Sequence, residues 1–196
     1  MWQGIHDALE GVARRAVLIA GMALLAAAAL VSVDVLCRKF LSLTVSCSDE
    51  ISGYVFAAGT TWAYSYALLH RSNVRIDAVY NLLPLWLRAV LDVVGVSLLL
   101  FYMGIQTHLA LGAFIESWES DSVSVTTLAT PLWIPQLFWV VGLILFMITL
   151  IFVAIFSLAK LLAGDYAAVN VVAGVLSVDD EVEEEMRGLD LDGKRV

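Results

Sequence analysis

The chain alternates long apolar stretches with short polar ones, and four of the apolar stretches are long enough to cross a membrane. A helix needs about 20 apolar residues to cross about 30 Å of hydrocarbon. The pattern predicts transmembrane helices at about 16–36, 51–69, 87–113 and 136–158, which together form a membrane domain of residues 16–159. Residues 1–15 then form an N-terminal segment and residues 160–196 a C-terminal tail.

The distribution of Lys and Arg predicts the orientation of these spans, because basic residues accumulate on the cytoplasmic side of membrane proteins. One side of the predicted domain has Arg38 and Lys39 near the span ends. The side that holds both termini has six basic residues: Arg14, Arg15, Arg71, Arg75, Arg88 and Lys160. We therefore expect both termini in the cytoplasm.

The connections between the spans are short. Within residues 73–83, apolar side chains recur at helical spacing, which predicts a short interfacial helix before Pro84. Most of the net charge of −8 lies after residue 164, in an acidic tail that we expect to be solvated and disordered. The chain offers no basic face for nucleic acid.

The composition decides between broad classes of protein. The chain is 61% hydrophobic and 15% charged, whereas soluble domains are about 45–50% apolar and about 25% charged. This excludes a soluble enzyme, a disordered chain and a disulfide-rich module. The sequence predicts an all-α integral membrane protein that is not an enzyme and holds no cofactor and no metal site. Cys37 and Cys47 share the predicted outer loop, either as one disulfide or as two free thiols.

Small residues recur at every fourth position of the second span, at Gly53, Ala57, Thr61 and Ser65. Such a stripe lets another helix approach closely. Two interpretations remain open at this point. The stripe packs on a similar alanine-rich stripe of the first span, or it meets a separate membrane subunit.

The spans lack the chemistry of an independent carrier. Carriers and pumps keep ionisable groups deep in the membrane, whereas Asp34 and Asp92 lie near the ends of their predicted spans. His70 and His108 are separated by most of the bilayer, so they cannot ligate the same haem iron. A self-sufficient homo-oligomeric carrier and a membrane anchor of a redox enzyme are thus the weaker alternatives.

Residues 15–160 resemble the small membrane subunit of tripartite ATP-independent periplasmic (TRAP) transporters, the DctQ-like family. The resemblance lies in the size, the four predicted spans and an ordered set of landmarks. These are Arg38-Lys39-Phe40, Asp49-Glu50, His70, Val74-Arg75-Ile76-Asp77, Leu83-Pro84, Thr127-Leu128 and Pro131-Leu132-Trp133.

The resemblance implies a non-catalytic scaffold in a bacterial-type inner membrane, surrounded by lipid. A large membrane subunit would hold the substrate and sodium sites and would move as an elevator. A periplasmic binding protein would deliver the substrate, typically an organic acid. The substrate itself is not readable from this chain, because the resemblance places specificity in the other two proteins.

The resemblance also implies roles for particular residues. Arg38, Lys39, Asp49 and Glu50 would set helix geometry at the outer side; the residues alone allow Asp49 and Glu50 either to cap the second span or to pair with Arg38 or Lys39. The inner loop would be organised by His70, Arg75 and Asp77, with Arg75 near lipid phosphates or the large subunit. The residues expected to touch the binding protein are Glu116, Trp118, Glu119 and Asp121.

Overall fold

The computed structural model describes residues 2–42, 47–70, 83–126, 128–166 and 168–169. Within these ranges the chain forms four helices and no strand. The helices are α1 (Trp2–Leu41), α2 (Ser48–Leu69), α4 (Leu85–Glu119) and α5 (Trp133–Leu162). Each expected span lies inside one of these helices, which confirms the all-helical prediction.

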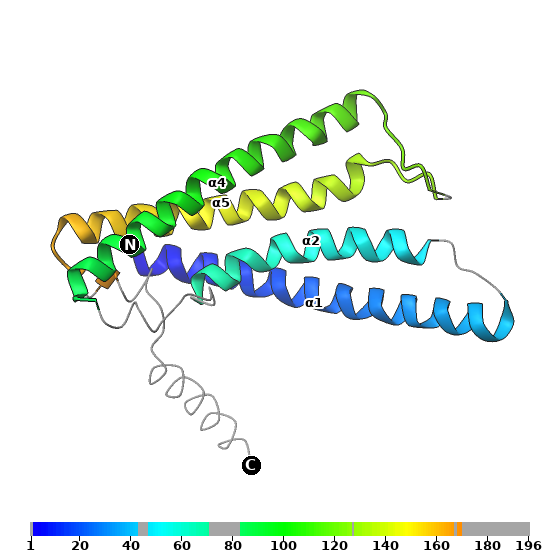
Figure 1. Cartoon of the computed structure of the whole chain (residues 1–196), viewed down its shortest axis with the longest axis horizontal. Coiled ribbons are helices and arrows are strands. Elements are labelled where there is room, and N and C mark those ends of the chain that lie inside the picture. Colours follow the sequence, from blue (N-terminus) through cyan, green and yellow to red (C-terminus); the bar gives the residue numbers. More distant parts are fainter. Residues whose placement is uncertain (1, 43–46, 71–82, 127, 167, 170–196) are drawn as a thin grey trace, which may run out of the picture.

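The four helices lie in an open row (Figure 1). α1 and α2 form one antiparallel hairpin, and α4 and α5 form a second one. α2 packs against both α1 and α5, and α5 also packs against α4. The order across the row is therefore α1, α2, α5, α4. We call the end with the start of α1 and the end of α5 the terminal end, and the opposite end the loop end.

Three of the described helices, α1, α4 and α5, are long and apolar enough to cross a membrane. α2 does not reach the same hydropathy, because Ser, Thr, Tyr and Gly interrupt its apolar residues. Its place between α1 and α5 accounts for this composition, since buried Thr61 and Ser65 sit where neighbouring helices pack. The span expected at 51–69 therefore stays a prediction, as do the orientation and the domain boundaries.

α1 packs along α2 with small residues spaced seven apart. Ala13, Ala20 and Ala27 are buried, and buried Asp34 continues the series. A seven-residue repeat keeps one seam of a helix against its partner in a left-handed pair. Alanine leaves room for the two backbones to approach, as in other membrane helix pairs.

The largest apolar core lies between α4 and α5. Val96 and Met103 of α4 pack with Leu143, Phe146 and Leu150 of α5. Beyond α5, the fully buried Val169 packs with side chains near the start of α4. α5 thus contacts helices on both sides and holds the second hairpin to the first.

A glycine sets the distance between the two hairpins. A Cβ atom added at Gly142 would lie 2.4 Å from both Thr61 Oγ1 and Trp62 Cδ1. Side chains do not tolerate such distances, so the absence of a side chain is what lets α5 approach α2 here. One turn earlier on α5, the carbonyl of Phe138 accepts a 2.8 Å hydrogen bond from Trp62 Nε1.

Two predictions concern residues outside the described ranges. The interfacial helix expected at 73–83 falls almost wholly within residues 71–82, and most of the acidic tail falls within 170–196.

Of the two open states of the cysteines, the structure has free thiols at Cys37 and Cys47.

We predict that Gly142→Ala destabilises the protein by about 1–3 kcal/mol, because the added methyl group overpacks the contact between α2 and α5. Gly112→Ala is the matched control, since a Cβ at this glycine of α4 meets nothing within 4 Å. The control should be neutral or stabilising by about 0.5–1 kcal/mol. Unfolding in detergent micelles measures both, and equal stability of the two variants would contradict the close contact.

Candidate functional site

The stripe of small residues on α2 divides into two halves. Thr61 is 3% exposed and Ser65 is 0% exposed, so this half is used for packing inside the chain. Gly53 and Ala57 are exposed, and a Cβ added at Gly53 meets nothing within 4 Å. The two interpretations of the stripe therefore apply to different halves, and only the half with Gly53 and Ala57 is open to another helix.

The open half borders a groove of about 610 Å³ between α2, α4 and α5. Ala57 and Thr60 lie on its α2 wall, and Tyr102 and Gln106 lie on its α4 wall. Large exposed apolar side chains flank it, with Phe56 62% exposed. A helix of a second membrane protein would meet small residues beside aromatic ones here.

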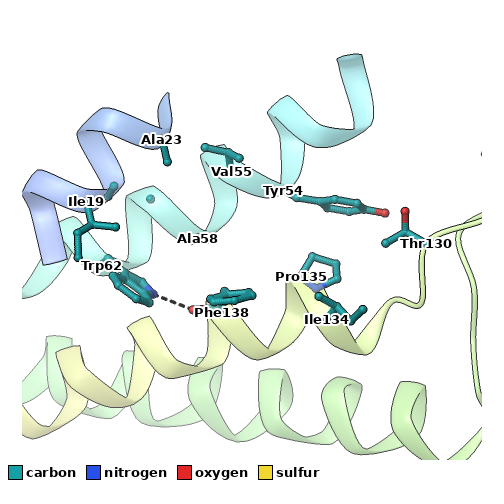
Figure 2. A pocket seen from close by; sticks show the side chains of 12 residues that line it. Ile19, Ala23, Tyr54, Val55, Ala58, Trp62, Thr130, Ile134, Pro135 and Phe138 are labelled. Atoms are coloured by element: carbon teal, nitrogen blue, oxygen red, sulfur yellow. Dashed lines mark hydrogen bonds between the residues drawn. The ribbon is translucent and has the colours of Figure 1, made fainter. Parts of the chain in front are cut away.

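A second groove lies on the other face of α2, between α1, α2 and α5 (Figure 2). Figure 2 shows the indole of Trp62 pointing at the backbone of Phe138 and the hydroxyl of Tyr54 pointing towards Thr130. The lining is almost wholly apolar and consists of Ile19, Ala20, Ala23, Tyr54, Val55, Ala58, Gly59, Trp62, Thr130, Ile134, Pro135 and Phe138. This groove suits hydrocarbon better than a charged solute.

At the loop end, buried Asp34 joins α1 to α2. Its carboxylate accepts hydrogen bonds from Arg38 Nη2 at 2.6 Å and from Ser48 Oγ at 2.9 Å. Arg38 lies one turn further along α1, whereas Ser48 is the first residue of α2. Because charge-assisted hydrogen bonds are short and strong, this contact fixes how the two helix ends meet.

The predicted outer residues therefore play different parts. Arg38 pairs with Asp34 rather than with Asp49 or Glu50, and Lys39 lies over the ring of Phe40 at 5.6 Å. Asp49 is exposed in the first turn of α2, where its charge suits the positive end of the helix dipole. The residue before α2 is Cys47, whose side chain makes no capping hydrogen bond.

Glu50 connects α2 with the loop between α4 and α5. Its carboxylate accepts hydrogen bonds from the Thr126 hydroxyl and, at 2.5 Å, from the Tyr54 hydroxyl. These hydrogen bonds, first that of Thr126, hold the pKa of Glu50 below its ordinary value. The contact is therefore complete above the ordinary carboxyl pKa and is lost as the pH falls through the lowered one.

With this geometry in view, the comparisons with known proteins decide the family. The model of the family described as "Tripartite ATP-independent periplasmic transporters, DctQ component" matches residues 27–161, which is more than half of the chain. The chain belongs to the DctQ family. Comparisons with curated proteins and with solved structures give no match. The matched range runs from within α1 nearly to the end of α5, so it covers both hairpins.

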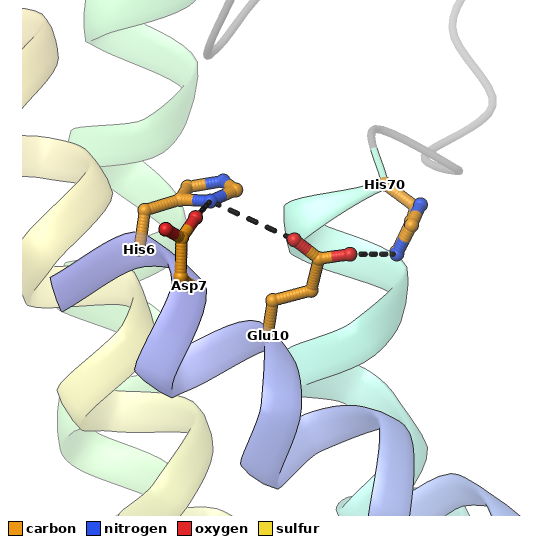
Figure 3. Close-up of polar contacts among 4 residues, drawn as sticks. All are labelled: His6, Asp7, Glu10 and His70. Carbon is orange, nitrogen blue, oxygen red and sulfur yellow. Dashed lines mark ion pairs between the residues drawn. The ribbon is translucent and has the colours of Figure 1, made fainter. Parts of the chain in front are cut away.

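DctQ proteins are components of TRAP transporters, and the predicted inner residues of this one are only partly described. His70 follows the last residue of α2, and its ring stacks on Tyr66 with 4.1 Å between ring centroids. Its Nε2 is 3.7 Å from a carboxylate oxygen of Glu10 on α1 (Figure 3). Arg75 and Asp77 lie outside the described residues.

The acidic segment of this DctQ protein lies at the loop end, where α4 finishes. All four residues expected to touch a binding protein are exposed there: Glu116, Trp118, Glu119 and Asp121. The Trp118 ring packs edge-on against Trp133 at 4.9 Å. The loop that follows is held by a 2.9 Å hydrogen bond from Ser124 N–H to the Thr130 carbonyl. The acidic side chains thus sit on a supported surface.

Sequence reasoning missed three contacts of this DctQ protein. It did not single out Gly142, although a glycine inside an apolar helix is a signal for close helix approach. It also did not bring Glu50 to Thr126 or Glu10 to His70, because both pairs are far apart along the chain. Only the packing of the hairpins reveals those neighbours.

We predict that Asp34→Asn lowers the free energy of unfolding by about 1–3 kcal/mol, because Arg38 and Ser48 lose a charged acceptor. Asp49→Asn is the matched control, since it removes an exposed carboxylate only fifteen residues along the chain and should change stability by less than about 0.5 kcal/mol. Unfolding of the full chain in detergent measures both. If the control loses as much stability as Asp34→Asn, the buried contact does not hold the helix ends together.

Proposed function

We propose that this chain is the fixed, non-catalytic scaffold of a TRAP transporter in a bacterial-type inner membrane. In this proposal all four helices span the membrane, with both termini in the cytoplasm and the loop end in the periplasm. A large membrane subunit moves the substrate, an organic acid, with sodium as the coupling ion. A periplasmic binding protein delivers that acid. Membership in the DctQ family supports the assignment.

The observation that carries the scaffold role is the position of charge. The middles of the four helices, residues 16–33, 51–69, 93–115 and 136–159, contain no Asp, Glu, Lys or Arg. The charged contacts of the described residues lie near helix ends, as with Asp34–Arg38 and Lys160–Asp165. A chain that moves ions or organic acids alone keeps ionisable groups at depth, and these ranges hold only one histidine, His108, as a candidate. We therefore assign the transport chemistry to a partner.

The open half of the α2 stripe supplies a docking face for the large subunit. Gly53 and Ala57 leave room for a close approach, and the neighbouring groove offers aromatic walls and the amide of Gln106. Helices in membranes associate through such close packing and through polar contacts rather than through the hydrophobic effect. The proposed interface therefore runs along α2 and the adjoining face of α4.

The first test is copurification. The chain, extracted from its native membrane in mild detergent, should bring a much larger membrane subunit in equal amount. Ala57→Leu should reduce the recovery of that subunit by about tenfold, since a loss of about 1.4 kcal/mol of binding free energy has this effect. Ala26→Leu on exposed α1 is the control and should not change recovery. A chain that purifies alone or as a homo-oligomer would favour the self-sufficient carrier, and a haem spectrum would favour the redox anchor.

The acidic loop-end surface gives a second test. Glu116→Gln, Glu119→Gln and Asp121→Asn in one variant should slow sodium-driven uptake of the carboxylate that copurifies with the binding protein. Charges at the edge of a protein–protein interface act mainly on the association rate. The loss of uptake should therefore become smaller when the binding protein is in large excess. A triple neutralisation in the C-terminal tail, at Asp179, Asp180 and Glu181, is the charge-matched control. Unchanged uptake in the loop-end variant would remove the contact from the proposal.

A further inference from the structure

A cluster of metal-ligating side chains lies where the start of α1 meets the end of α2. Figure 3 shows Glu10 between His6 and His70, with one carboxylate oxygen turned towards each ring. Glu10 Oε2 lies 3.7 Å from His6 Nδ1, and Glu10 Oε1 lies 3.7 Å from His70 Nε2. Asp7 Oδ1 lies 3.8 Å from the same nitrogen of His6. The proposed transport role gives no task to His6, Asp7 or Glu10.

These distances fit ligands around an ion better than they fit hydrogen bonds. A hydrogen bond between nitrogen and oxygen is about 2.7–3.2 Å long. Around a tetrahedral Zn²⁺ with bonds of about 2.0–2.2 Å, neighbouring ligand atoms lie about 3.4 Å apart. The ligand atoms of His6, Asp7 and Glu10 all lie within 4.8 Å of one another. His70 stands outside this group, on the other side of the Glu10 carboxylate (Figure 3), so the Glu10 and His70 side chains must turn before His70 can reach an ion held by the other three.

The helices hold the donors on converging faces. His6 and Glu10 are four residues apart and share one face of α1, the spacing by which two ligands on one helix reach the same ion. His70 comes from the other helix, and its ring is held by the stacking on Tyr66. An ion bound by these residues would therefore connect α1 with α2.

We propose that His6, Glu10 and His70, with Asp7, bind a divalent first-row transition metal of the Zn²⁺ type. The bound ion clamps the start of α1 to the end of α2. Two imidazole nitrogens and carboxylate oxygens suit Zn²⁺, Co²⁺ or Ni²⁺, whereas Mg²⁺ and Ca²⁺ prefer oxygen ligands alone. Metal binding then stabilises the folded chain, because His70 joins the three donors of α1 only when α1 and α2 are packed.

The test uses the purified full-length chain together with the large subunit that copurifies with it. The affinity tag contains no histidine. Co²⁺ is added in steps, and the visible absorption of the bound ion is recorded. We expect one Co²⁺ per chain, displaced by Zn²⁺ and not by Mg²⁺. Glu10→Gln, His6→Gln and His70→Gln should each weaken binding by at least about tenfold, the loss that even outer ligand partners produce. His108→Gln is the matched control because His108 is the third histidine of the chain and lies on α4.

A thermal melt in the presence of a metal chelator first shows that each variant is folded. Added Zn²⁺ should then raise the melting temperature of the wild-type protein and of His108→Gln, and not that of Glu10→Gln. Absence of Co²⁺ binding by the wild type would overturn the proposal, as would equal weakening in His108→Gln. Stability that depends on pH but not on Zn²⁺ would also overturn it, because plain ion pairs between protonated histidine and Glu10 would then account for the contacts.

Discussion

The two helical hairpins of this DctQ protein are held together by the close approach of α5 to α2 at Gly142. Thr61 and Trp62 fill the space that any side chain at residue 142 would need, and the Trp62 indole finds its acceptor one turn earlier on α5. Because α5 also carries the core shared with α4, the second hairpin reaches the first mainly through this line of contact. The open row, with α1 and α4 at its edges, follows from it.

Among the described residues, contacts between charged side chains and their partners gather at the two ends of the row. Asp34, Arg38 and Ser48 meet at the loop end, where Glu50 also reaches Thr126. At the terminal end, Lys160 donates a 2.9 Å hydrogen bond to Asp165, which lowers the pKa of that carboxyl. Charge in hydrocarbon is costly, so this distribution agrees with the scaffold role proposed above.

Much of the fold is readable from the sequence, because long apolar stretches have few structural alternatives to membrane helices. The stretches at 87–113 and 136–158 indicated α4 and α5 directly. α2 was harder to predict, because its hydroxyl-bearing and small residues lower its hydropathy. Only the absence of charged residues indicated this helix. The stripe at Gly53–Ala57–Thr61–Ser65 predicted close packing but could not identify the partner, because small residues permit contact with any helix. Glu10 and His70 could not be paired at all, since only the crossing of α1 and α2 brings them together.

The length of α1 has a consequence for the kind of bilayer that suits this protein. Glu10 and Asp34 are joined by 24 helical residues, or about 36 Å at 1.5 Å per residue, and the hydrocarbon of a typical bilayer is about 30 Å thick. In the proposed topology, α1 would hold the polar contacts of both ends close to the two surfaces of such a bilayer. A thinner membrane would force the row to tilt, and a thicker one would draw a carboxylate towards the acyl chains. In that topology, the spacing of Glu10 and Asp34 along α1 would match the protein to a bilayer of ordinary thickness.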